Sequence, residues 1–260
     1  MLYCTCLVAV VITSCSDNVV QTDPIVNDHE THLRELISKY PDSLLLKENL
    51  VQYFRDNGDY HQALAETDNV LKKDSLNARF LDMKGTLHFE KGDTMNAIRA
   101  FEKAVSIKQV PEYIISLGSL YAQTKNPLAL KVGDELLHLP LVDAQKKGYF
   151  IKGLFFSYTG DKIKAIAFFN TCLKIDYRDL LAYREKAICL YDLGKYSTAL
   201  DELEKAVAVK KTFDEGYYWM GRCYEKLDKG KEAIDNYQLA LQIDPDYKEA
   251  KDALQKMETR

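Results

Sequence analysis

The feature that most constrains this chain is an internal repeat of 34 residues. The triplets that begin at Gly58, Gly92, Gly160 and Gly194 resemble one another and are separated by 34, 68 and 34 residues. Repeats of this length are typical of solenoids, in which each unit packs only on its neighbours. A frame that starts at Leu44 contains six units without an insertion: 44–77, 78–111, 112–145, 146–179, 180–213 and 214–247.

The columns of this frame predict a pair of antiparallel helices in each unit. Position 20 is Ala in five of the six units, and small residues there let two helices approach closely. Position 15 is Gly in four units, where it supplies the positive φ that ends a helix. The 260 residues include only 12 Gly and 6 Pro, which also favours long helices over a β architecture with many turns.

The repeat resembles the tetratricopeptide repeat. The resemblance implies an all-α superhelix, an α-solenoid of antiparallel helix pairs, over residues 28–260. A half-unit at 28–43 precedes the six repeats, and a polar capping helix at 248–260 follows them. The last full unit carries the family's motif most completely, at Tyr217, Gly221, Tyr224, Ala233, Tyr237, Ala240 and Pro245.

The third unit departs from the pattern. It has Lys131 at position 20, where the other units have Ala. Pro127 can open the second helix of this unit, and Pro140 should end it near His138 or Leu139. We therefore predict a shortened helix and a local change in superhelical pitch. Drift in one unit and a functional hinge are both open explanations.

The first residues of the chain predict an export signal. The stretch from Leu2 to Ile12 is mostly apolar and too short to span a membrane, which takes about 20 residues. The sequence Ile12-Thr13-Ser14-Cys15 resembles a bacterial lipoprotein signal, in which the Cys carries the lipid. We expect a signal peptide at 1–14, lipidation of Cys15 and a flexible tether at 15–27; the alternative is a leader in which Cys15 is incidental.

The residue after Cys15 bears on location. By resemblance to lipoproteins of Gram-negative bacteria, Ser16 favours the outer membrane, so we expect the protein in the cell envelope, facing the periplasm or the cell surface.

Three cysteines, Cys172, Cys189 and Cys223, would remain in the folded domain after the signal peptide is removed. They stand at helical positions without a disulfide pattern and are predicted to be core residues.

The sequence offers no catalytic motif. It lacks a G-x-G-x-x-G sequence, a P-loop and an H-E-x-x-H pair. A net charge of −4 with no basic segment is also unlike a nucleic-acid-binding protein. We therefore expect a non-enzymatic protein that uses neither cofactor nor metal.

The family resemblance implies a binding groove. In tetratricopeptide arrays the first helices line the concave face, and positions 2, 5, 9, 12 and 13 tend to contact ligands. Clustered apolar, aromatic and Arg side chains at such positions are typical of interaction surfaces. The alternative is that they pack between neighbouring first helices. The predicted groove residues are Arg79, Phe89, Phe150, Leu154, Tyr158, Arg184, Ile188, Tyr191, Tyr218 and Arg222.

The same positions indicate what kind of partner to expect. Some chaperone-binding members of the family hold a C-terminal carboxylate with Lys at position 5 and Asn at position 9. In the fifth unit these positions hold Arg184 and Ile188, so that clamp is absent. An extended or helical peptide with apolar anchors fits better.

We expect a protein-interaction scaffold or assembly adaptor that is anchored to the membrane through Cys15. One alternative is an envelope assembly factor similar to the pilotins of pilus secretins or to the lipoprotein of the barrel-assembly machine. A second is an accessory subunit of an enzyme complex, and a third is an array whose groove is filled by its own tether.

Overall fold

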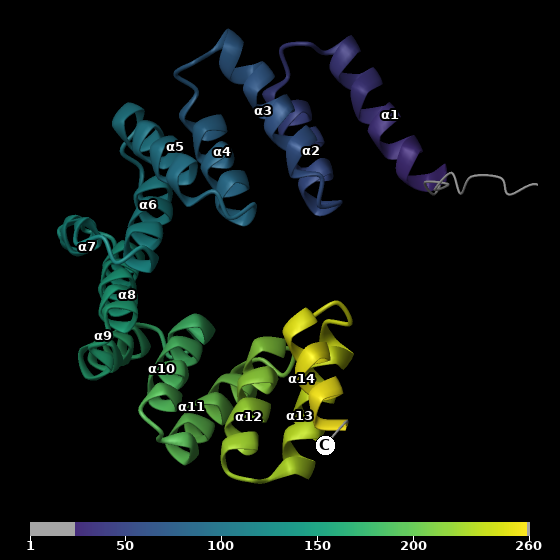
Figure 1. Cartoon of the computed structure of the whole chain (residues 1–260). Coiled ribbons are helices and arrows are strands. Elements are labelled where there is room, and N and C mark those ends of the chain that lie inside the picture. Colours follow the sequence, from purple (N-terminus) through teal and green to yellow (C-terminus); the bar gives the residue numbers. More distant parts are fainter. Residues whose placement is uncertain (1–23, 259–260) are drawn as a thin grey trace, which may run out of the picture. The chain divides into compact units, whose positions relative to one another are not determined.

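A computed structural model describes residues 24–258 of the chain. In this part of the protein fourteen α-helices follow one another and no strand occurs (Figure 1), which confirms the predicted all-α solenoid of antiparallel helix pairs. None of these helices is both long and apolar enough to cross a membrane. The helices are α1 (Pro24–Lys39), α2 (Leu44–Asp56), α3 (Tyr60–Lys73), α4 (Ala78–Glu90), α5 (Thr94–Ile107), α6 (Pro111–Gln123), α7 (Leu128–Leu137), α8 (Val142–Thr159), α9 (Lys162–Ile175), α10 (Leu180–Asp192), α11 (Tyr196–Val209), α12 (Asp214–Lys226), α13 (Gly230–Ile243) and α14 (Lys248–Glu258).

The chain divides into two compact units, of which the first ends at Glu66 and the second begins at Thr67. In the first unit, the Arg34 guanidinium of α1 lies 5.6 Å from the centre of the Phe54 ring of α2 and 2.9 Å from the Glu66 carboxylate. In the second unit, α5, α7 and α9 lie on the outer side of a curved array and α4, α6, α8 and α10 on its inner side (Figure 1). First helices thus line the inner side of the second unit.

The N-terminal predictions fall mostly outside the described residues. These include the signal peptide at 1–14, the lipid site at Cys15 and the tether up to residue 23. The last residues of the predicted tether are helical, because α1 begins at Pro24 and not at residue 28. Pro suits the first residue of a helix, since its φ is already fixed near the helical value and no intrahelical bond needs its missing N–H.

A left-handed residue ends or follows the first helix in each of the six repeats. The predicted positive φ is confirmed at the four Gly of position 15 and recurs at Asp228 of repeat 6, where φ is 56°. In repeat 3 the left-handed residue is Lys125, not Asn126 as the frame predicts. The turn of this repeat therefore comes one residue early.

The second helix of repeat 3 is shortened, as predicted. It has 10 residues, whereas α5, α9, α11 and α13 have 14 each. Pro127 is its N-cap and His138 its C-cap. The fully buried Ala of this helix is Ala129, two positions before Lys131, and Lys131 itself is exposed. The change in superhelical pitch stays a prediction.

Small residues at position 8 make room for aromatic rings in the even-numbered repeats. In repeat 4 a Cβ on Gly153 would lie 2.7 Å from the Phe169 ring, which is closer than carbon atoms approach. The Gly–aromatic pairs are Gly85 with Phe101, Gly153 with Phe169 and Gly221 with Tyr237.

The three cysteines of the described chain are buried, as predicted.

Candidate functional site

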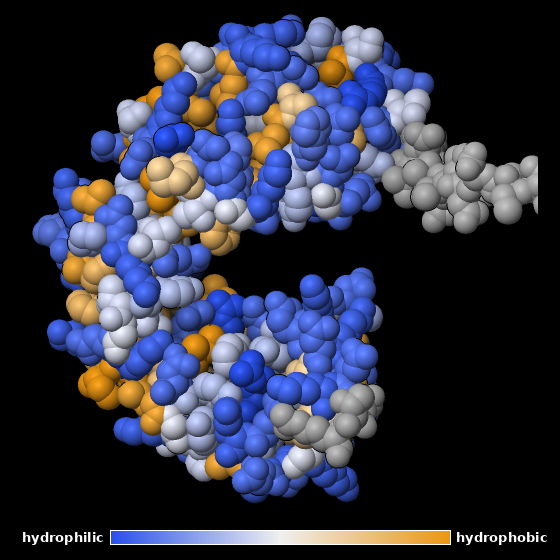
Figure 2. Space-filling model, in the orientation of Figure 1, coloured by the Kyte–Doolittle hydropathy of each residue, from blue (hydrophilic) through white to orange (hydrophobic). Residues whose placement is uncertain are grey.

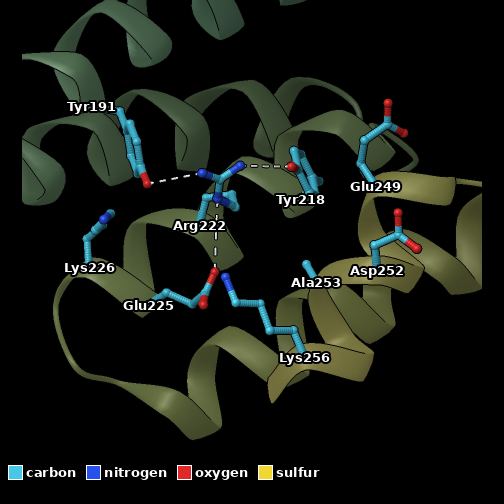
Figure 3. Close-up of a pocket in the computed structure, with 9 residues that line it drawn as sticks. All are labelled: Tyr191, Tyr218, Arg222, Glu225, Lys226, Glu249, Asp252, Ala253 and Lys256. Carbon is cyan, nitrogen blue, oxygen red and sulfur yellow. Dashed lines mark hydrogen bonds and ion pairs between the residues drawn. The ribbon is translucent and has the colours of Figure 1, made fainter. Parts of the chain in front are cut away.

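Two cavities open between the first helices of the C-terminal repeats, and both lie in the second unit. We name them the Tyr158 cavity, of about 440 Å³, and the Arg222 cavity, of about 450 Å³. Figure 2 shows a mainly hydrophilic surface on the face in view, with hydrophobic residues scattered among the hydrophilic ones. The Tyr158 cavity is lined by Lys125, Ser157, Tyr158, Lys162, Arg184, Glu185, Ile188, Asp192, Glu215 and Trp219. The Arg222 cavity is lined by Tyr191, Tyr218, Arg222, Glu225, Lys226, Glu249, Asp252, Ala253 and Lys256 (Figure 3).

Arg222 is held at the centre of its cavity by three aromatic side chains. Its guanidinium carbon lies 5.5 Å from the ring centre of Tyr191, 5.9 Å from that of Tyr218 and 5.6 Å from that of Trp219. The guanidinium also donates hydrogen bonds to the hydroxyl oxygens of Tyr218 at 2.9 Å and Tyr191 at 3.3 Å (Figure 3). Cation–π attraction and these two bonds fix the Arg222 side chain before any partner binds.

A second helix positions the acidic neighbour of Arg222. The Tyr237 hydroxyl of α13 donates a hydrogen bond of 2.7 Å to Glu225 Oε2 of α12. Burial and then this carboxylate raise the pKa of Tyr237 above its ordinary value, so the phenol stays protonated and continues to donate. Glu225 Oε2 also lies 4.0 Å from Arg222 Nε. The Arg222 side chain is thereby neutralised in part from its own helix.

The capping helix α14 contributes both acidic and basic side chains to the Arg222 cavity, namely Glu249, Asp252 and Lys256. Glu249 and Asp252 are exposed, and neither forms a hydrogen bond or ion pair with another residue of the described range 24–258. In Figure 3 they lie on one side of Arg222, and Lys226 lies on the other. The lining as a whole holds three basic side chains, Arg222, Lys226 and Lys256, and the three acidic ones Glu225, Glu249 and Asp252.

Apart from Lys125, the charged side chains of the Tyr158 cavity are paired with one another. Arg184 binds Glu185 at 2.8 Å and also binds Glu215 of the next repeat. Lys162 and Asp192 lie 2.6 Å apart. The surfaces that remain for a partner are mainly Tyr158, which is 42% exposed, together with Ile188 and Trp219. In the described part of the chain, no three His, Cys, Asp or Glu side chains are grouped closely enough to hold a metal ion.

The structure separates the predicted groove residues into two sets. Six line the cavities: Tyr158, Arg184 and Ile188 line one, and Tyr191, Tyr218 and Arg222 line the other. The remaining four line neither cavity: Arg79, Phe89, Phe150 and Leu154.

Leu154 packs inside the array, and Phe150 is partly buried against it. Leu154 is only 5% exposed and belongs to the apolar core around α6, α8 and α9. The ring of Phe150 lies 5.6 Å from that of Phe169. The cause is the close approach of α6 to α8: a Cβ on Gly118 of α6 would lie 2.8 Å from Ile151 of α8. Arg79 and Phe89 are exposed on α4, at a distance from either cavity lining.

Sequence reasoning missed the contribution of α14. Counted from Lys248, positions 2, 5 and 9 of the capping helix are Glu249, Asp252 and Lys256, the positions that the family resemblance assigns to ligand contact. Extending the repeat frame into the cap would have identified all three. Trp219 of repeat 6 packs against Tyr191 of repeat 5, with ring centres 5.6 Å apart, and also lines a cavity.

Comparison with known protein families and proteins shows what this chain is similar to. Family models described as tetratricopeptide repeat match residues 49–113, 147–179 and 215–247, which together make up about half of the chain. The chain is 24% identical over 180 residues to stress-induced-phosphoprotein 1 of Caenorhabditis elegans, covering 69% of this chain and 53% of that protein. It is 28% identical over 222 residues to Hsp70-Hsp90 organizing protein 3 of Arabidopsis thaliana, covering 80% and 38%. The chain thus spans about half, or less, of the length of these relatives.

Solved structures agree with the fold. A tetratricopeptide repeat protein from Parabacteroides merdae is 20% identical and has a TM-score of 0.74, with 90% of this chain and 92% of that chain covered. PilW, a type IV pilus biogenesis factor, is 19% identical with a TM-score of 0.61, covering 80% and 97%. From its repeat columns, its helix pairs and these matches, the chain belongs to the tetratricopeptide repeat family, whose arrays serve as scaffolds for protein binding.

Proposed function

We propose that this protein is a non-enzymatic scaffold that binds a segment of a partner protein along α8, α10, α12 and α14. The observation that carries the proposal is the continuity of the two cavities. Tyr191 of the Arg222 cavity packs edge-on against Trp219 of the Tyr158 cavity, with ring centres 5.6 Å apart. One extended segment can therefore contact both cavities.

The dimensions of the helices suit an extended peptide. Packed helices lie roughly 8–10 Å apart, and an extended chain advances roughly 3.3–3.6 Å per residue. About every third residue of a crossing segment would thus face a new first helix. Tyr, Trp and Arg are the side chains that most often anchor protein interfaces, and they dominate the contact between the two cavities. Similarity to Hsp70–Hsp90 organizing proteins supports a role in bringing other proteins together.

Site-specific photo-crosslinking in cells tests this function. A photoreactive residue is placed at Tyr158 or Lys226, which are exposed in the two cavities, and at the exposed Lys231 of α13 as the control. We expect the same partner protein to be captured from both cavity positions and not from Lys231. Adducts that form only at Lys231 would show that second helices, and not the cavities, carry the binding surface.

We further propose that the scaffold is attached to the bacterial cell envelope by lipid at Cys15, on the outer membrane. The support is the sequence Ile12-Thr13-Ser14-Cys15. Replacing Cys15 with Ala should abolish labelling by a palmitate analogue and release the protein from membranes. The matched control is Cys6→Ala, because Cys6 would leave with the signal peptide. Continued labelling of the Cys15→Ala protein would refute lipidation at this residue.

A further inference from the structure

We propose that the partner segment carries an Asp or Glu side chain that binds in the Tyr158 cavity beside Lys125. This inference rests on the proposed function, since it specifies the chemistry of the segment that crosses the two cavities. The occupant of the Tyr158 cavity is thus an acidic side chain with an apolar neighbour in the same segment.

Lys125 is the charged side chain of this lining that has no charged partner. The lining also holds three carboxylates, and each of them pairs with a basic side chain of the same lining. These ion pairs are Arg184 with Glu185, Arg184 with Glu215 and Lys162 with Asp192. Lys125 is exposed, and its side chain forms no hydrogen bond or ion pair with any residue of the described range 24–258. A carboxylate of a partner can therefore bind Lys125 without breaking an ion pair of the array.

Uncharged donors of the same lining lack an acceptor as well. The Ser157 hydroxyl is only 6% exposed and accepts two hydrogen bonds, both of 3.4 Å, but it donates none within the described part of the chain. The Tyr158 hydroxyl and the Trp219 indole N–H form no hydrogen bond with residues 24–258 either. Polar groups of a protein are normally paired, and the groups left over here are all donors. The ligand that they fit presents acceptor oxygens, as a carboxylate does.

Apolar surface lies beside these donors. Ile188 and the rings of Tyr158 and Trp219 line the same cavity of about 440 Å³, and Tyr158 is 42% exposed. An apolar side chain of the segment can pack on this surface while its acidic neighbour reaches Lys125. Attraction between opposite charges is also stronger beside apolar surface than in open water, because the local dielectric constant is lower. The cavity therefore fits an acidic residue that stands close to an apolar one.

The backbone at Lys125 allows a substitution that does not endanger the fold. Its φ of 58° lies in the left-handed region, which Gly adopts without strain and Lys does not. Four other repeats have a Gly with positive φ in the corresponding turn. Lys125→Gly therefore removes the ammonium group and should leave the protein at least as stable as the wild type, which urea denaturation measures. A loss of binding in this variant then cannot come from unfolding.

Selection from a display library of random peptides against the full chain tests the inference. The peptides are joined to their carrier through the C-terminus, so that only side chains supply carboxylates. The wild-type protein should enrich peptides in which Asp or Glu stands at a constant distance from an apolar residue. In Lys125→Gly the acidic preference should disappear, and a selected peptide should bind about tenfold more weakly. In Lys125→Glu a basic preference should replace the acidic one, because the charge in the cavity is reversed.

The matched control is Lys91→Glu in repeat 2. Lys91 has the same position in its repeat as Lys125, is exposed and lines neither cavity. This control should keep both the acidic preference and the affinity. Enriched peptides without an acidic preference, or a preference that is unchanged in both Lys125 variants, overturn this inference alone. Failure of the wild-type protein to enrich any peptide overturns the proposed function as well.

Discussion

Single charged side chains stabilise the array where they are buried together with their partners. Glu202 of α11 is almost fully buried and lies 2.9 Å from Lys186 Nζ and 2.8 Å from Lys205 Nζ. Burial alone would raise the pKa of Glu202, but hydrogen bonds from the two lysines outweigh it and hold this pKa below its ordinary value. A folded-state pKa below that of the unfolded chain means that the ionised carboxylate favours the folded state.

The pH dependence of this contribution follows from its sign. The stabilisation by Glu202 is complete above the pKa of an unfolded Glu, about 4.3, and disappears as the pH falls through the lower folded-state pKa. We therefore expect Glu202→Gln to reduce the free energy of unfolding at pH 7 by about 1–3 kcal/mol. The deficit should shrink near pH 3. Urea denaturation at both pH values measures it, with Glu232→Gln as the exposed control; an equal deficit at both pH values would be inconsistent with this role.

A second prediction at the residue scale concerns Gly153 and Phe169. Since a Cβ on Gly153 would overlap the fully buried Phe169 ring, Gly153→Ala should cost about 1–2 kcal/mol even though Ala is the better helix former. Repeat 5 carries Ala187 and Leu203 at these positions. The cost of Gly153→Ala should accordingly be smaller in a Phe169→Leu background. A double-mutant cycle by urea denaturation measures the coupling, and strictly additive effects would rule out this contact as the reason for Gly.

At the scale of helices, the repeat frame predicted much of the architecture because its columns record contacts within a pair. The Gly at position 15, the Ala at position 20 and the shortened α7 all followed from local chemistry. The turn at Lys125 did not, because a Lys with positive φ has no sequence signal and is imposed by the surrounding packing. Leu154 was misplaced for a similar reason: the columns do not record how closely α6 approaches α8.

The approach of two helix backbones predicts a large effect of a small substitution. A Cβ on Gly148 of α8 would lie 2.7 Å from the backbone carbonyl oxygen of Gly133 of α7. Backbone cannot turn aside as a side chain can, so Gly148→Ala must separate the two helices, and we expect a loss of about 2–3 kcal/mol of stability. The control is Gly230→Ala of α13, where the nearest atom is Met257 Cε at 3.6 Å. Thermal and urea denaturation should show the control close to wild type; similar losses in both variants would argue against the close approach.

At the scale of the molecule, the candidate site depends on several repeats at once. The two cavities take side chains from α8, α10, α12 and α14, so no single repeat contains the site. The sequence predicted six of its lining residues through the family's positions. It could not predict that Arg184 would form ion pairs with Glu185 and with Glu215 instead of facing a ligand. Glu215 belongs to the next repeat, and it comes close to Arg184 only when the repeats stack. Similarly, the value of α14 as a binding surface depends on its packing beside α12.

Hydrogen–deuterium exchange tests the binding groove most directly. Exchange is measured by mass spectrometry on the full chain, alone and saturated with the peptide of highest affinity that is selected against this chain from a display library of random peptides. If the groove binds the peptide, exchange slows in α8, α10, α12 and α14 and stays unchanged in α9, α11 and α13. Slowing confined to α9, α11 and α13, or no change in any helix at saturation, would contradict the assignment of the two cavities as the partner-binding site.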